Sequence, residues 1–244
     1  RMFYLCHAYL PGSGFYQGRQ PYLQELRFGE DGWPHFVTGE YASLVQPMPF
    51  TDCVQEPVTG FFDDFNGASL RPEWSWNYPY ADVKTEIKSG RLLLSGSPKA
   101  EFKSGEALCL RPAASDYTLE TGVSNRNDSW KGITMYGDNS CYLAFGCVGE
   151  RLQLKTVREG KEQLLADLPL PCPALHLRME VKDGLPFLFA WSKDGKNWSD
   201  LSHGLSDETI RSLIRWDRVA RPGLYHEGDA KAPAVFEYCS LSYR

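Results

Sequence analysis

Three kinds of segment are missing from this sequence, and each absence excludes a class of protein. No run of about 18 apolar residues occurs, so the sequence predicts neither a membrane-spanning helix nor a membrane partner. Basic residues form no cluster, and 31 acids outnumber 26 bases, so nucleic acid is not an expected partner. None of the seven Cys belongs to a Cys-x-x-Cys pair, which argues against zinc and thioredoxin-like redox sites. We expect these thiols to be buried as small apolar groups.

Strand-forming composition is what the sequence offers instead. Aromatic residues make up 14% of the 244 residues, and 22 Gly and 16 Pro are dispersed among them. From Phe61 onward, short apolar or alternating runs recur at intervals of about ten residues, with turn residues between them. Residues 175–181 alternate strictly between apolar and polar side chains, and Asp183-Gly184 then gives a hairpin signal. These patterns predict an all-β fold, an antiparallel β-sandwich over residues 61–244, with one helix over residues 206–214.

Residues 1–37 are expected to form a unit of their own. Residues 2–9 are a dense apolar run, residues 22–28 alternate, and a Glu-Asp-Gly turn leads into a third strand that begins at Trp33. Three strands alone are marginal in water, so this unit needs a partner to pack against. Residues 38–60 carry several Pro and no clean periodicity, which indicates an ordered linker that lies over a surface.

Two sets of motifs carry a resemblance to a known family. Residues 4–9 and 18–36, which include Glu30-Asp31-Gly32 and Trp33-Pro34, resemble the last blade of the five-bladed β-propeller of glycoside hydrolase family 43. The later motifs resemble the concanavalin A-like, jelly-roll C-terminal sandwich of β-xylosidases in that family. They are residues 62–67, 70–77, 108–112, 117–121, 131–138 and 191–198. One departure is Leu110, where the family usually carries Gln.

This resemblance implies that the chain is the C-terminal segment of a glycoside hydrolase acting on arabinose- or xylose-containing plant polysaccharides. In the family, the catalytic Asp, Asp and Glu lie on earlier propeller blades, so no acid in this sequence matches a catalytic position. The chain alone is therefore expected to be inactive. Its expected partners are plant cell-wall oligo- or polysaccharides and a catalytic propeller domain or chain. No signal-peptide pattern follows Arg1, so the compartment is not readable, and a secreted or periplasmic location is the favoured expectation.

His7 and Arg19 are candidates for an active-site position. In some members of the family, a His at the position of His7 lies near the propeller axis, close to an ion or water. An imidazole suits this role because one nitrogen binds while a neighbour fixes the other. Arg19 is expected to lean into the same site. The alternatives are a hydrogen-bonded core histidine and a surface ion pair.

Sugar binding is expected of a cluster of aromatic residues, because flat rings pack against sugar C–H groups. The cluster contains Trp74, Trp76, Tyr78 and Tyr80. Trp130 lies in a polar stretch of sequence, where burial explains a Trp poorly, so we expect it to contact sugar or a neighbouring domain. For the four residues of the cluster the alternative is packing in the sandwich core and against the propeller.

Calcium is the one cofactor that the resemblance implies. In the family's sandwich, a calcium ion is common and is held by oxygen ligands from the first and last strands. Asp63 or Asp64 would supply one ligand here, while Glu237 stands where an Asp is common. Asp63 and Asp64 are not expected to act as a catalytic pair, because neighbours on a strand point to opposite faces.

Three functions therefore stay open. The first is the segment of a hydrolase just described, with the sandwich as an accessory or carbohydrate-binding domain. The second is a stand-alone, non-catalytic carbohydrate-binding module. The third is a purely structural sandwich that buttresses a catalytic domain.

Overall fold

The structure, a computed structural model, describes residues 2–8, 19–48, 56, 58–99, 104–124, 126–170, 172–203, 205–206 and 219–244. Within these ranges the chain forms strands and loops and contains no helix, so none that could cross a membrane is found there. The predicted all-β fold class is confirmed. The helix expected over residues 206–214 lies outside the described residues, apart from Ser206 itself.

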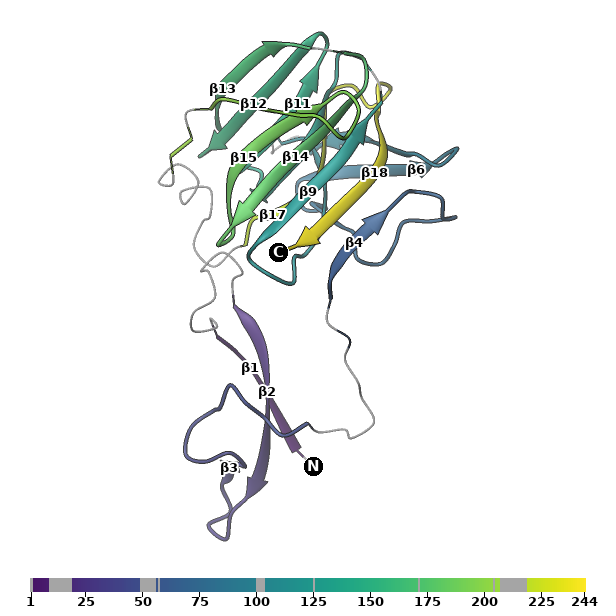
Figure 1. The fold of residues 1–244 in the computed structure, drawn as a ribbon. Helices are drawn as coiled ribbons and strands as arrows, with labels where there is room; N and C mark the ends of the chain where they lie inside the picture. Colours follow the sequence, from purple (N-terminus) through teal and green to yellow (C-terminus); the bar gives the residue numbers. More distant parts are fainter. Residues whose placement is uncertain are drawn as a thin grey trace.

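Two large antiparallel sheets form a sandwich, and a small sheet extends from one end of it (Figure 1). The small sheet contains β1 (Met2–Ala8), β2 (Gln20–Phe28) and β3 (Pro34–Phe36). The seven-stranded sheet contains, in spatial order, β13 (Lys161–Pro169), β12 (Arg151–Arg158), β11 (Cys141–Val148), β10 (Trp130–Asp138), β17 (Arg221–Glu227), β8 (Glu106–Cys109) and β5 (Ser75–Trp76). The eight-stranded sheet contains β16 (Trp198–Asp200), β15 (Leu185–Ser192), β14 (Leu175–Lys182), β9 (Tyr117–Val123), β18 (Ala234–Tyr243), β7 (Leu92–Pro98) and β6 (Ala81–Ile87), and β4 (Gly60–Asp63) also pairs with β18.

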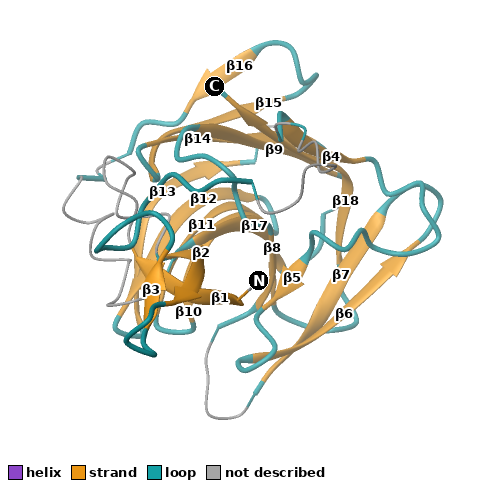
Figure 2. Ribbon diagram, turned by 90° about the horizontal axis from the view of Figure 1, so that it is seen from below, coloured by secondary structure: helices purple, strands orange, loops and turns teal. Residues whose placement is uncertain are grey.

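The main core fills the space between the two large sheets, which appear as nested arcs in Figure 2. Phe145 of the seven-stranded sheet and Phe189 of the eight-stranded sheet are fully buried, with ring centroids 5.6 Å apart in an edge-to-face contact. Burying each such side chain contributes about 1.5–3 kcal/mol. The strict alternation of β14 places Leu175, Leu177 and Met179 in this core, which confirms the sequence prediction for that strand.

Hairpin turns join neighbouring strands where the sequence predicts them. Asp183 and Gly184 have φ values of 52° and 76° and connect β14 to β15. Positive φ at both central positions is what a two-residue hairpin turn of the I′ type requires. Gly32, with φ of 75°, likewise turns the chain between β2 and β3.

Three strands lack a clear sequence signal. β6 and β13 lie at sheet edges, and every residue of β13 is exposed or only half-buried, so it shows no apolar alternation. β17 contains Pro222 and Gly223, which are typical of a loop, yet it lies between β10 and β8. The close approach of β8 requires glycine at position 223, because a Cβ there would lie 2.3 Å from the carbonyl oxygen of Leu108.

The small sheet is only partly covered within the described part of the chain. β1 pairs with β2 from Met2 opposite Leu26 to Ala8 opposite Gln20. The dense apolar run of β1 forms the predicted strand but is not fully buried, since Leu5 is 67% exposed.

Gln24 fastens the following segment onto β2. Its side-chain nitrogen donates to the carbonyl of Ser43, and its side-chain oxygen accepts from the amide N–H of Ser43 and from Gln46. Gln24 is 1% exposed, so these bonds satisfy a buried amide. They hold residues 43–46 against the strand, and the linker over residues 38–60 stays a prediction.

Cysteines in the described ranges form no disulfide. Cys109, Cys141, Cys147 and Cys239 are buried, as the sequence predicts, and Cys6 and Cys172 are half-buried.

Candidate functional site

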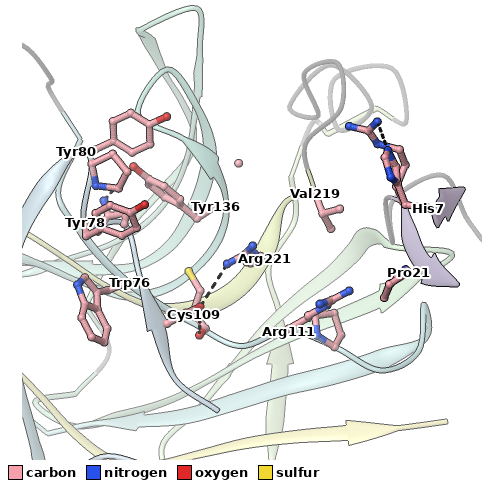
Figure 3. A pocket seen from close by; sticks show the side chains of 16 residues that line it. His7, Pro21, Trp76, Tyr78, Tyr80, Cys109, Arg111, Tyr136, Val219 and Arg221 are labelled. Carbon is pink, nitrogen blue, oxygen red and sulfur yellow. Dashed lines mark hydrogen bonds between the residues drawn. The ribbon is translucent and has the colours of Figure 1, made fainter. Parts of the chain in front are cut away.

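A cleft of about 670 Å³ lies where the small sheet meets the sandwich (Figure 3). The small sheet contributes the ends of β1 and β2, and the sandwich contributes β5, the loop after it and the ends of β8, β10 and β17. The lining residues are His7, Arg19, Pro21, Ser75, Trp76, Asn77, Tyr78, Pro79, Tyr80, Cys109, Arg111, Pro112, Tyr136, Gly137, Val219 and Arg221. The structure therefore brings together five of the residues that the sequence singles out: His7, Arg19, Trp76, Tyr78 and Tyr80.

His7 and Arg19 form a direct pair on one side of this cleft. The Nη1 atom of Arg19 lies 2.7 Å from Nε2 of His7. A guanidinium only donates hydrogen bonds, so Nε2 of His7 must accept, and the imidazole is neutral with its proton on Nδ1. The sequence expectation that the two residues share a site agrees with this contact, while a role in holding an ion or water stays a prediction.

Aromatic side chains form the opposite side of the cleft (Figure 3). Trp76 is 53% exposed and Tyr78 is 69% exposed, so both rings are accessible. The buried Asn77 between them fixes their backbone: its Nδ2 donates to the carbonyl of Gly105, and its Oδ1 accepts from the amide of Ala107. Rigid placement of this kind lowers the entropy cost of binding a ligand on the two rings.

Tyr136 lies beside Tyr78 and Tyr80 on the aromatic side (Figure 3). Its hydroxyl lies 3.0 Å from Nδ2 of Asn77 and 2.9 Å from Oγ of Ser104. Burial raises the pKa of Tyr136, so this hydroxyl stays protonated and acts as a hydrogen-bonding group. Burial also raises the pKa of Cys109 to about 12, although the nearby Arg221 guanidinium opposes the shift. The Cys109 thiol is therefore not a nucleophile in this cleft.

Trp74 does not take part in the cleft, which corrects the sequence expectation for it. It is 5% exposed and packs in the main core, between Phe61 and Phe65. Its indole N–H donates to Oδ2 of Asp63 at 2.9 Å. The contact between Asp63 and Trp74 is made only by tertiary packing. The sequence therefore could not separate Trp74 from the other three aromatic residues of the cluster.

Trp130 is also buried, so the expectation of an accessible residue in a polar loop is wrong. It is the first residue of β10 and is 5% exposed. Its ring lies on the face of the seven-stranded sheet that points away from the main core, 5.5 Å from the ring of Tyr225. The Nζ atom of Lys155 lies 5.4 Å from its centroid, a cation–π contact.

A protein-family model matches most of this chain. The model for the β-xylosidase C-terminal concanavalin A-like domain matches residues 62–240. The chain belongs to this family. The resemblance that the sequence motifs indicate is therefore confirmed for the sandwich, whereas the assignment of β1–β3 to a propeller blade stays a prediction.

Solved structures of glycoside hydrolase family 43 proteins share the fold. The BlXynB protein of Bacillus licheniformis aligns with a TM-score of 0.72 at 18% identity, over 93% of this chain and 47% of that chain. Xylan β-1,4-xylosidase of Bacillus halodurans C-125 aligns with a TM-score of 0.70 at 19% identity, over 98% of this chain and 50% of that chain. This chain thus spans about half the length of each. No curated protein sequence matches it.

The described side chains that the resemblance suggests for calcium are already engaged in hydrogen bonds or an ion pair. Oδ1 of Asp63 accepts the amide N–H of Phe65, and Oδ2 accepts the Trp74 indole N–H. Asp64 accepts from the backbone and side chain of Asn66, and Glu237 pairs with Arg91. Within the described residues, no group of three or more His, Cys, Asp or Glu side chains could hold a metal ion. Calcium binding at Asp63 and Asp64 stays an untested prediction.

Two residues that line the cleft could not be identified from the sequence. Arg111 follows β8 and Arg221 begins β17, and both are exposed to the cleft. Arg111 is part of a family motif, but nothing in the sequence indicates that it faces Arg221. Neither residue lies beside aromatic or acidic neighbours in the sequence, so no local pattern could have identified them.

Proposed function

We propose that this chain is the C-terminal segment of a glycoside hydrolase and that its cleft binds arabinose- or xylose-containing chains of plant polysaccharide. The observation that carries the proposal is the cleft itself, in which the exposed residues Trp76 and Tyr78 line one side and the His7–Arg19 pair lines the other. Its volume of about 670 Å³ lies within the range of small-ligand sites. A solved structure of similar fold is a xylan β-1,4-xylosidase, which supports this class of sugar.

Hydrolysis in this proposal needs groups from another part of the protein. Glycoside cleavage uses two carboxyl groups across the scissile bond. No Asp or Glu is among the described residues that line the cleft. The sandwich is therefore proposed as an accessory domain that forms one wall of a sugar site, with the catalytic acids on a propeller domain.

The small sheet supports the existence of such a partner. Leu5 of β1, Phe28 of β2 and Trp33 of the turn before β3 are 67%, 65% and 72% exposed. Leu5 and Phe28 lie on opposite faces of the β1–β2 pair, so this small sheet carries exposed large apolar side chains that packing against another domain would cover. A catalytic propeller continuing from β1 would cover it.

Calorimetric titration of the 244-residue chain with a neutral xylo-oligosaccharide tests the binding proposal. We expect measurable affinity that falls about tenfold or more in Trp76→Ala, because the ring supplies contact area for a sugar face. Phe187→Ala is the matched control, since Phe187 is 46% exposed on β15 of the other sheet. Affinity that is absent, or equal in both variants, would favour a purely structural sandwich instead.

Native mass measurement and an activity assay test the partner proposal. We expect purified chain alone to release no sugar from arabinan or arabinoxylan. Sugar release by this chain alone would contradict the assignment of the catalytic acids to another domain.

A further inference from the structure

The strand register places two arginines opposite each other on the floor of the cleft. β17 and β8 are antiparallel, with Gly223 opposite Cys109. The amide of Leu110 then donates to the carbonyl of Pro222, so the pairing continues one residue beyond β8. The next residues in this register are Arg111 and Arg221. Both side chains line the cleft, and Figure 3 shows them between the aromatic side and His7.

Within the described part of the chain, this arrangement leaves the positive charge of Arg111 and Arg221 without a counter-charge. Like charges directly opposite each other on neighbouring strands destabilise a sheet. Among the described residues, no carboxylate lies within ion-pair distance of either arginine. Arg111 has one neutral contact, to Oε1 of Gln20, and Arg221 has one, to Oγ of Ser75, each at 3.5 Å.

Several other arginines of the chain differ in this respect. Arg71, Arg151 and Arg178 each pair with a carboxylate at 2.6–2.8 Å. The whole chain has five more acids than bases, so acid side chains are available in excess. Arg111 and Arg221 face each other in a cleft whose described lining contains no acid, so this part of the cleft is complementary to an anion.

Neutral pentoses do not account for these charges. Amides and hydroxyls suffice to bind sugar hydroxyl groups, whereas a guanidinium matches a carboxylate through two parallel hydrogen bonds. The exposed rings of Trp76 and Tyr78 line the same cleft and offer faces for sugar rings. An anion next to a stacking surface is the chemistry of a sugar acid.

We propose that the cleft binds a glycan that carries a uronic acid unit, with its carboxylate held by Arg111 and Arg221. This inference rests on the proposed function, because it names the substrate class of the same cleft. The uronate supplies the missing counter-charge, while neighbouring neutral sugars pack on the aromatic side.

The test compares two ligands that differ by one charge. The 244-residue chain is titrated with a neutral xylo-oligosaccharide and with the same oligosaccharide bearing one glucuronic acid side unit. We expect the acidic ligand to bind about tenfold tighter or more, because hydrogen bonds to charged groups are the stronger class. This ratio of affinities should fall as salt is raised from about 0.05 to 0.5 M, because the site is open to solvent.

Substitutions assign the preference to the two arginines. In Arg111→Gln and Arg221→Gln the ratio should fall towards one. It should stay at the wild-type value in Arg91→Gln, whose residue lies on the β6–β7 turn and pairs with Glu237 at 3.9 Å. Arg221→Lys keeps the charge but not the two-pronged geometry, so we expect an intermediate ratio of affinities. This variant replaces Arg221→Gln in the test if Arg221→Gln does not fold.

The outcomes separate this inference from the proposed function. Binding of neither ligand overturns the proposed function and this inference with it. Binding of the neutral ligand with a wild-type ratio of one overturns the inference alone, and it would assign the counter-charge to a carboxylate of the catalytic domain. A high ratio that survives both Gln substitutions also overturns it.

Discussion

Oε2 of Glu106 lies 2.5 Å from Nδ1 of His226 in the interior of the sandwich, and both side chains are fully buried. The two residues are directly opposite each other on β8 and β17. The other ring nitrogen, Nε2 of His226, donates to the carbonyl of Ala232 at 3.0 Å. One proton is therefore shared between the imidazole and the carboxyl, and removal of either partner would leave a buried polar group unsatisfied.

Breaking this pair should be costly. We expect Glu106→Ala to lower the free energy of unfolding by about 3–5 kcal/mol, as measured by urea denaturation at neutral pH. Glu73→Ala is the control: Glu73 pairs with Arg71 at 2.6 Å, but both side chains are more than 40% exposed. That exposed pair should be worth about 1 kcal/mol or less. Equal losses in the two variants would contradict the role of the buried pair.

Trp130 provides a test of burial against sugar contact. Its indole N–H has no hydrogen-bond partner among the described residues, so Trp130→Phe loses no hydrogen bond. We expect Trp130→Phe to cost about 1.5 kcal/mol or less and Trp130→Ala about 3–5 kcal/mol in unfolding free energy. Oligosaccharide affinity in calorimetry should be unchanged by Trp130→Phe. A loss of affinity like that expected for Trp76→Ala would return Trp130 to the binding site.

Local sequence patterns predict the sandwich because individual strands show apolar alternation and are followed by recognisable turn residues. β14 alternates with a period of two, and Asp183-Gly184 supplies the positive φ values that its hairpin needs. β17 could not be predicted in this way. Pro222 and Gly223 are tolerated there because of contacts with β8 and β10, which are set by tertiary packing.

The candidate site, too, could be predicted from the sequence only in part. The aromatic cluster identifies Trp76 and Tyr78, but composition cannot separate them from Trp74, which a hydrogen bond to Asp63 holds in the core. Arg111 and Arg221 face each other only because β8 pairs with β17, and these two strands are far apart in the sequence. Charge complementarity of this kind becomes visible only once the register is known.

Metal removal tests the calcium prediction. Because both oxygens of Asp63 already accept N–H groups, we expect a chelator such as EDTA to leave the thermal unfolding midpoint of the chain unchanged. The measurement is a thermal scan with EDTA, followed by addition of excess Ca²⁺ or Mg²⁺. A midpoint that falls with EDTA and recovers with Ca²⁺ alone would show that an ion binds. Loss of this recovery in Asp64→Asn would then locate the ion.

Asp194 should make the stability of the hairpin between β15 and β16 depend on pH. Its Oδ1 atom accepts the amide N–H groups of Asn197 and Lys196 and the hydroxyl of Ser192. Together with the Asn197 side-chain amide, these donors hold the pKa of Asp194 well below its ordinary value. A carboxyl whose pKa is lower in the folded state binds its proton more readily when unfolded. Its stabilising contribution is therefore complete above the unfolded pKa of about 3.9 and is lost as pH falls below it.

The measurement is urea denaturation of the wild type and Asp194→Asn at pH 7, 5, 3 and 2. We expect the wild type to be more stable by a constant amount at pH 7 and 5, and this difference to shrink at pH 3 and again at pH 2. Asp82→Asn is the control, because Asp82 is exposed on β6 and its carboxylate accepts no hydrogen bond within the described part of the chain. Its difference from the wild type should not shrink in the same way. A difference for Asp194→Asn that is equal at all four pH values would mean that the turn is held by its shape alone and not by the charge of the carboxylate.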